Sequence, residues 1–326
     1  MNKNWQKIIT RFPEANLLQS PEYGKMNEIC GDKVLTSELG GAGWALMIVR
    51  AAKRGRYLEI PCGPLIDFSD AEAREKVFVE IREIAKKEKC VFVRVRPQLR
   101  KTAENLEILA NLGLKKSPMH LAAEHTVILD LTKSEADLLA EMRRQTRYEV
   151  RQAEKKGIVV KKSRTKEMFE EFHAMQVETA KRQGFVPPNL KMLMAEREAF
   201  GEDAEIYLAE TKEGEKIAYG LVIRSGLEAD YYEAASTLLN RKLPGAYALL
   251  WQAIRDAKKA GCARFNLWGI APAGQPHHRY AGVTTFKTGF GGEIVEYVPA
   301  HDLVISRARY LKNLIVETIR RKKRHL

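Results

Sequence analysis

The sequence predicts an α/β protein made of two similar units, each with a mixed sheet flanked by helices. Apolar runs of strand length alternate with segments of helical periodicity, which is typical of sheets that contain parallel pairs. Residues 204–236 read instead as three consecutive strands with short turns, so antiparallel pairs are expected as well. Residues 81–97 and 254–270 share one pattern, a helix ending in lysines, then a cysteine and a strand. This repeat indicates duplication of one α/β unit.

In the first half of the chain, a short helix within residues 14–30 is expected to begin at Ser20-Pro21, because proline fits the first helical turn. The elements after it are expected as strands at 45–52 and 56–66, a helix at 70–89, a strand at 90–97, a helix at 103–112 and a strand at 125–132. The apolar face of the helix at 70–89 is expected to consist of Val77, Val79, Ile81 and Ile84.

In the second half, Ser134 is expected to start a long helix that runs to about Lys156, because Ser134 and Asp137 have the spacing of a capping box. The elements after it are expected as a strand at 158–163, helices at 166–182 and 189–199, three strands within 204–236, a helix at 245–259 and a strand at 262–270. Residues 282–292 are also interpreted as a strand.

The net charge of +13 points to a polyanionic partner, which can be nucleic acid, anionic lipid headgroups or a phosphorylated substrate. A solubilising surface is the alternative. Residues 143–162 and 307–324 carry much of this charge. No run of about 18 apolar residues occurs, and charge and Pro13 interrupt the N-terminal segment, so neither a membrane span nor a secretory signal is expected.

Neither a metal centre nor a cofactor is expected. The four cysteines are Cys30, Cys62, Cys90 and Cys262. They have no CxxC spacing, which fits a reduced cytoplasmic setting. His277 and His278 are adjacent in a polar segment without a carboxylate partner, which is weak evidence for a metal. The sequence has no P-loop, Rossmann fingerprint or nucleophile elbow, so any chemistry is expected to be direct attack between two positioned substrates.

A basic stripe is expected on the helix that follows Ser134. Arg143, Arg147, Arg151 and Lys155 are spaced four residues apart and would share one helical face. A solvated surface is the alternative interpretation. Only Glu149 and Glu154 are acidic in residues 142–158, so pairing within the helix does not neutralise the stripe.

One lysine, Lys287, stands between Phe286 and Phe290 and is followed by the pair Gly291-Gly292. In a strand, Phe286 and Lys287 would face opposite sides of the sheet, and the glycines would allow backbone or substrate to approach closely. An edge strand whose lysine reaches solvent is the alternative.

Residues 241–246 join a strand to a helix, and free N–H groups at such a helix start can bind phosphate. Acetyltransferases of the GNAT class hold the CoA pyrophosphate there with an R/Q-x-x-G-x-G/A turn. This segment has one glycine, preceded by proline, and no second glycine at the required spacing. The sequence therefore argues against a CoA site.

Three motifs together resemble the Fem family (FemXAB), the non-ribosomal peptidyltransferases that build peptidoglycan cross-bridges. They are RRQTRYEVRQAEKKG at 143–157, the unit from YYEAAST to NLWGIAP at 231–272, and GVTTFKTGFGG at 282–292. The resemblance covers nearly the whole chain and is strongest from 142 to 300. It implies two GNAT-like domains, residues 1–140 with 303–326 and residues 141–302, with the C-terminal segment packing back on the first. No long heptad run is present, so the form without a coiled-coil arm is expected.

The resemblance also implies an activity, the transfer of an amino acid from aminoacyl-tRNA to the stem-peptide amine of a peptidoglycan precursor. The acceptor would be a UDP-MurNAc-peptide or a lipid-linked muropeptide. The basic stripe and the tail at 320–326 would meet the tRNA or an anionic membrane surface, which makes a cytoplasmic protein with peripheral contact at the inner face of the membrane the expectation.

By position, Phe286 and Lys287 match the family's Phe-Lys pair, which serves the aminoacyl-tRNA end and the transition state. Tyr231 matches an aromatic residue that lines the precursor site, and Phe265 stands where the family tends to have tyrosine. Lys25 and Arg224 are the nearest candidates for binding the diphosphate.

Elementary chemistry agrees with these roles. An aminoacyl ester is already activated, so holding amine and ester together can contribute roughly 7–11 kcal/mol. Attack creates an oxyanion that Lys287 is suited to stabilise. Binding of the terminal phosphate of the tRNA is the alternative role for Lys287. A general base is left open, with Asp230 or Glu233 as candidates. An acyl-CoA-dependent GNAT N-acyltransferase and a non-catalytic RNA-binding protein on a GNAT-like scaffold are the alternative functions.

Overall fold

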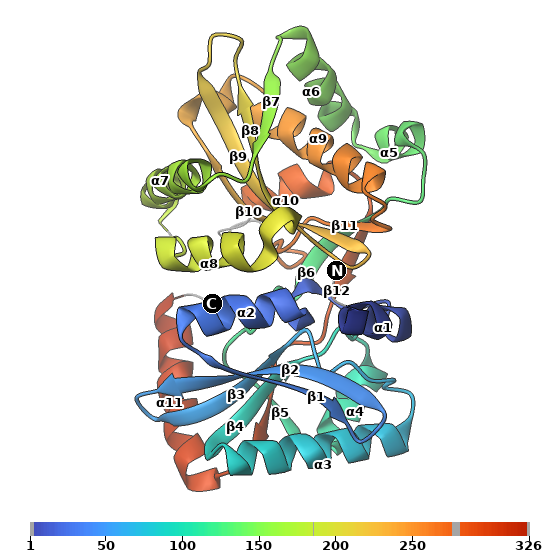
Figure 1. The fold of residues 1–326 in the computed structure, drawn as a ribbon, viewed down its shortest axis with the longest axis vertical. Helices are drawn as coiled ribbons and strands as arrows, with labels where there is room; N and C mark the ends of the chain where they lie inside the picture. The colour runs from blue at the N-terminus through green and yellow to red at the C-terminus, as the bar shows by residue number, and fades with distance from the viewer. Residues whose placement is uncertain (1–2, 185, 276–280, 325–326) are drawn as a thin grey trace. The chain divides into compact units, whose positions relative to one another are not determined.

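The computed structural model describes residues 3–184, 186–275 and 281–324. The chain forms two compact units, residues 1–124 with 296–326 and residues 125–295 (Figure 1). Its last segment therefore returns to the first unit. The first change of unit falls before β6 (His125–Asp130), because this strand pairs with β11 (Arg264–Asn266) of the second unit, whereas the sequence suggested a boundary after residue 140.

The sheet of the first unit has the order β1-β2-β3-β4-β13-β5. Its strands are β1 (Lys33–Leu39), β2 (Gly43–Ala52), β3 (Gly55–Pro61), β4 (Cys90–Arg96), β13 (His301–Val304) and β5 (Leu114–Lys116). The first three are antiparallel, and β4 then runs parallel to β3 after the helix α3 (Ala71–Lys87). The returning segment inserts β13 between β4 and β5 and pairs antiparallel with both.

The helices of the first unit pack on both faces of its sheet (Figure 1). They are α1 (Lys3–Arg11), the 3-10 turn η1 (Leu17–Gln19), α2 (Pro21–Cys30), α3, α4 (Ala103–Asn111) and α11 (Arg307–Arg324). The Ser20 hydroxyl caps α2 by accepting from the Tyr23 N–H, as the Ser20-Pro21 signal predicts.

The buried face of α3 differs in one respect from the prediction. It consists of Ala73, Val77, Phe78, Ile81 and Ala85. Val79 is 55% exposed, because it lies two residues from Val77 and therefore points to the other side of the helix.

The sheet of the second unit has the order β12-β6-β11-β10-β9-β8-β7. Its remaining strands are β12 (Glu293–Glu296), β10 (Glu228–Ser236), β9 (Lys216–Ser225), β8 (Ala204–Glu210) and β7 (Val159–Ser163). Strands β7 to β10 are antiparallel, and β11 runs parallel to β10 after α9 (Gly245–Lys259). Both units thus build an antiparallel meander, then a helix, then a parallel strand. The repeat at 81–97 and 254–270 marks this shared step.

The other helices of the second unit are α5 (Glu135–Glu141), α6 (Arg144–Lys155), α7 (Lys166–Gln183), α8 (Leu190–Phe200) and α10 (Ala281–Thr288), with 3-10 turns η2 (Gly201–Asp203) and η3 (Leu238–Arg241). The Ser134 hydroxyl accepts from the Asp137 N–H at 3.1 Å, so this helix start is confirmed. The single long helix is wrong, because Met142 is extended, with ψ of 143°, and buries its side chain in the core.

The strand expected at 282–292 is also wrong, since α10 and a glycine turn occupy these residues. The hydroxyls of Thr285 and Thr288 donate to the carbonyls of Ala281 and Thr284, one helical turn earlier. Phe286 lies on α10, and Phe290 lies two residues beyond its end.

Candidate active site

Lys287 lies in the last turn of α10 with its side chain buried, 7% of the residue being exposed. Its Nζ donates to the carbonyl oxygen of Gly269 at 2.9 Å and lies 6.0 Å from the centroid of the Tyr231 ring. Desolvation lowers the pKa of Lys287 from its ordinary 10.5 to about 7. The lysine is therefore neither a snorkelling surface charge nor part of a buried ion pair among the described residues.

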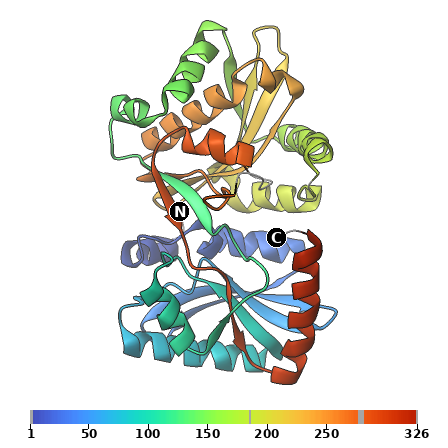
Figure 2. The same ribbon diagram turned by 180° about the vertical axis from the view of Figure 1, so that it is seen from behind.

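Helices α9 and α10 both belong to the second unit (Figures 1 and 2), and three aromatic rings connect them. The ring of Phe286 lies 5.0 Å from that of Tyr247 on α9 and 5.4 Å from that of Phe290. Tyr247 and Phe290 stack at 6.0 Å. Phe286 is half-buried in this cluster, so it orients the helix that carries Lys287.

Tyr231, on β10, lies beside Lys287, and 5% of it is exposed. Its ring lies on Gly220 of β9, where an added Cβ would come within 2.6 Å of Tyr231 Cε2. Glycine at position 220 therefore leaves the space that the Tyr231 ring occupies.

Gly269, whose carbonyl receives the lysine, was not singled out from the sequence. It follows Trp268, which has a φ of 60°. Non-glycine residues rarely adopt this conformation, and such residues concentrate at functional sites. No sequence pattern signals it.

The glycines after α10 serve close backbone packing. Gly289 accepts from the Arg143 N–H at 2.8 Å, and an added Cβ there would lie 2.2 Å from Thr146 Oγ1. Gly291 and Gly292 have φ of +85° and +81°, and their Cβ positions would meet the backbone of the second unit. The chain itself, rather than a substrate, approaches these glycines.

The basic stripe expected on α6 divides into two sets. The Arg143 guanidinium donates to the Thr285 carbonyl of α10. Arg147 Nη1 donates to the carbonyls of Leu139, Ala140 and Met142 at 3.2, 2.7 and 3.1 Å. These hydrogen bonds satisfy carbonyl groups that the end of α5 leaves without a partner inside the helix. These two arginines therefore hold local structure together.

Arg151 and Lys155 are exposed, and they share a face of α6 with Arg144 and Tyr148, the latter 53% exposed. The spacing of Arg144, Tyr148, Arg151 and Lys155 follows the helical repeat. We call these four residues the outer α6 face.

The residues proposed for precursor binding lie on different elements. Phe265 is fully buried in the core of the second unit, so it presents no surface to a ligand and that assignment is wrong. Lys25 is exposed on α2 in the first unit. Arg224, at the end of β9 in the second unit, donates to the Glu202 carbonyl at 3.0 Å and pairs with Asp203 at 3.2 Å.

Neither candidate general base contacts Lys287. Asp230 is fully buried in β10. Glu233 accepts from Gln176 of α7 at 2.6 Å, and its charge acts on the fully buried carboxyl group of Glu196 of α8. Burial raises the pKa of both glutamates, so this pair favours its protonated forms.

The start of α9 does not offer the free N–H groups of a CoA site. The Gly245 N–H donates to the Leu243 carbonyl at 2.8 Å, and the Ala246 N–H donates to Asn240 Oδ1 at 3.0 Å. An added Cβ at Gly245 would lie 2.4 Å from Ile217 Cγ2, so the helix start is packed tightly on β9. The sequence argument against a CoA cradle agrees with this geometry.

Within the described part of the chain, no three His, Cys, Asp or Glu side chains gather as metal ligands. His277 and His278 lie outside the described residues. Among the described helices, none combines the length and apolar character that crossing a membrane requires.

The fold places the chain among proteins with tandem GNAT-like units. A tandem GNAT protein from the clavulanic acid biosynthesis pathway matches with a TM-score of 0.52 and 11% identity, covering 81% of this chain and 79% of that one. The crystal structure of FemX matches with a TM-score of 0.84 and 18% identity, covering 96% of this chain and 98% of that one.

The sequence model of the FemAB family matches residues 2–218 and 210–317. The chain belongs to the FemAB family. Lipid II:glycine glycyltransferase from Staphylococcus aureus is 25% identical over an alignment 234 residues long, and this alignment covers 67% of this chain. The match spans 55% of that relative's length.

Proposed function

We propose that this protein is an aminoacyltransferase that adds an amino acid from aminoacyl-tRNA to the stem-peptide amine of a peptidoglycan precursor, a step of cross-bridge formation. Family membership and the glycyltransferase relative support the reaction class. The observation that carries the proposal is the buried, desolvated Lys287 beside Tyr231, without a carboxylate partner in the described part of the chain.

In the proposed reaction, the substrate amine attacks the ester carbonyl, so a C–N bond forms and the C–O bond to the tRNA ribose breaks. Because the pKa of Lys287 lies near 7, its neutral amine is available to take the proton that the attacking nitrogen loses. The resulting ammonium group stabilises the oxyanion, an effect typically worth about a hundredfold or more in rate. The proton then passes to the leaving ribose oxygen.

For the tRNA, the outer α6 face is the proposed contact. Arg144, Arg151 and Lys155 supply charge for phosphates, and the exposed ring of Tyr148 offers a stacking surface for a base. Arg143 and Arg147 contribute indirectly, by fixing α10 and α5.

For the acceptor, Tyr231 remains the proposed aromatic contact, and Lys25 and Arg224 remain the proposed diphosphate contacts. Either a UDP-MurNAc-peptide or a lipid-linked muropeptide fits this chemistry. Peripheral contact with an anionic membrane belongs to the proposal, since a lipid-linked acceptor is presented there.

The test is a transfer assay with the full chain. Transfer RNAs charged with single amino acids are mixed with a UDP-MurNAc-pentapeptide or with its lipid-linked form, and mass spectrometry follows the peptide. The proposal predicts the added mass of one or more amino acids on at least one acceptor, and none when uncharged tRNA is used. Unchanged peptide mass with every charged tRNA would reject it.

The two alternatives give different results. An acyl-CoA-dependent acyltransferase would bind acetyl-CoA in calorimetry, which the occupied start of α9 argues against. A non-catalytic RNA-binding protein would bind charged and uncharged tRNA equally, with a steep salt dependence and no turnover.

A further inference from the structure

Three aliphatic side chains form an exposed stripe along α11. Leu311, Ile315 and Ile319 are spaced four residues apart and are 56%, 52% and 50% exposed. This spacing keeps all three on one side of the helix. Single exposed aliphatics are common on protein surfaces, but a row of three on one helix needs a partner.

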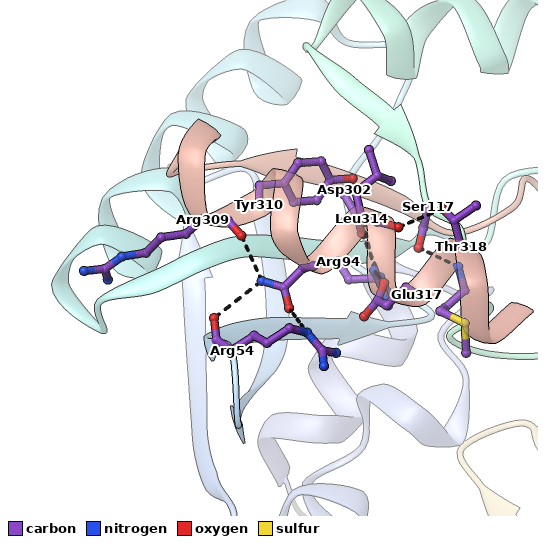
Figure 3. A network of polar contacts seen from close by, with 11 residues as sticks. Arg54, Arg94, Ser117, Asp302, Arg309, Tyr310, Leu314, Glu317 and Thr318 are labelled. Atoms are coloured by element: carbon purple, nitrogen blue, oxygen red, sulfur yellow. Dashed lines mark hydrogen bonds and ion pairs between the residues drawn. The ribbon is translucent and has the colours of Figure 1, made fainter.

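A polar network fixes the opposite side of α11 to the first unit (Figure 3). Arg94 of β4 donates to both carboxylate oxygens of Asp302, at 2.7 and 2.9 Å, and to Glu317 of α11 at 2.7 Å. The Tyr310 hydroxyl donates to Asp302 at 3.0 Å, and burial and the neighbouring carboxylate raise the pKa of Tyr310.

Asn313, also buried on this side, accepts from Arg54 Nε at 3.0 Å. Tyr310, Asn313 and Glu317 lie across the helix from the stripe, because residues two positions apart differ by about half a turn. The network therefore sets the rotation of α11 and holds the stripe outward.

The charge on α11 is strongly positive. Its sequence has eight basic residues and one acidic residue, Glu317. Glu317 is already paired with Arg94. The exposed Arg307, Lys312 and Arg320 therefore flank the stripe without an acidic residue on the same helix to neutralise them.

We propose that the outer face of α11 docks on an anionic lipid bilayer. Leu311, Ile315 and Ile319 enter the boundary between headgroups and acyl chains, and the basic flanks meet the anionic headgroups. A second copy of the chain does not fit, since two faces of this charge repel each other. An RNA partner does not account for the three exposed aliphatic side chains, because RNA-binding surfaces use cations and aromatic rings.

This inference deepens the membrane contact of the proposed function, on which it rests, by naming α11 as the surface that makes the contact. Docking of this kind would hold the chain where a lipid-linked precursor is presented. A transfer assay with the water-soluble UDP-linked acceptor does not require it, so the two proposals can fail separately.

Vesicle flotation of the full chain tests the docking face. Wild type is compared with the triple variant Leu311→Ser, Ile315→Ser, Ile319→Ser on vesicles of phosphatidylcholine alone and of phosphatidylcholine with phosphatidylglycerol. A matched control replaces three exposed aliphatics elsewhere, Val79→Ser, Val159→Ser and Leu227→Ser, which are 55%, 41% and 41% exposed. Circular dichroism and thermal unfolding verify that each variant folds.

Wild type and control are expected to float with the anionic vesicles and not with the neutral ones, and the stripe variant is expected to bind at least about tenfold more weakly. Wild type that does not float, or a stripe variant that floats like wild type, would overturn the proposal. So would a stripe variant whose only change is loss of a dimer in sedimentation or of RNA binding.

Discussion

Replacing Lys287 by methionine is expected to stabilise the fold, although the proposed activity depends on this lysine. Methionine has a similar length and no charge to desolvate. A pKa lowered from 10.5 to about 7 corresponds to a loss of about 5 kcal/mol in folding free energy when the lysine is protonated in both states, which is an upper limit for this buried group.

The pH dependence gives the prediction its sign. Between about pH 7 and 10.5 the unfolded chain binds a proton at Lys287 that the folded chain does not, so wild-type stability rises with pH in this window. The advantage of Lys287→Met is therefore largest below pH 7. It is expected to fall from at most about 5 kcal/mol near pH 5 to about 2 kcal/mol near pH 9.

Urea unfolding at the two pH values measures this difference directly. Lys181→Met, at an exposed position of α7, is the matched control and should change stability by less than about 0.5 kcal/mol. If Lys287→Met and wild type kept a constant difference across the pH range, the lysine would be solvated and the reasoning would be wrong.

Three further predictions address other parts of the second unit. Glu196→Gln should raise stability above neutral pH and flatten its pH dependence, because burial raises the pKa of Glu196 and the wild-type fold loses stability as pH rises through that raised value. Thermal unfolding at about pH 5 and pH 8 checks this. A variant that is less stable than wild type at the higher pH would contradict it. Gly292→Ala should lower the free energy of unfolding in urea by more than about 2 kcal/mol, because the φ of Gly292 is +81° and a Cβ there would lie 2.6 Å from the Ile128 carbonyl oxygen. Gly113→Ala is the control and should cost less, since Gly113 has a φ of +74° but no atom within 4 Å of its Cβ position. Equal losses of stability in the two variants would show that the contact does not matter. Tyr148→Ala should weaken tRNA binding by about 1–3 kcal/mol at any salt concentration, whereas Arg151→Ala should lower the salt dependence of binding. Filter binding measures both effects. Unchanged affinity in both variants would remove the outer α6 face from the tRNA interface.

Much of the fold is encoded locally and was predictable. The three-strand segment 204–236, the helix at 245–259 and the capped starts at Ser20 and Ser134 are set by alternation, turn residues and side-chain caps within a few positions. Strands β13 and β12 were not predicted, because each has four residues and is defined by pairing with distant strands. Local pattern carries little information about such short segments.

The site shows the same division between local and long-range information. Lys287 and Tyr231 could be singled out from their motifs, but the carbonyl of Gly269 and the space at Gly220 depend on tertiary packing. The expected single basic stripe is divided because the break at Met142 brings the last carbonyls of α5 within reach of Arg147, whereas Arg151 and Lys155 stay exposed on α6.

The central claim is that the buried amine of Lys287 acts on the reacting ester. Single-turnover transfer from charged tRNA to the soluble UDP-linked peptide tests it most directly, with Lys287→Met and Lys181→Met measured beside wild type. The claim predicts that Lys287→Met loses at least about tenfold in rate while it remains folded, and that Lys181→Met keeps the wild-type rate. Equal rates for all three proteins would contradict it.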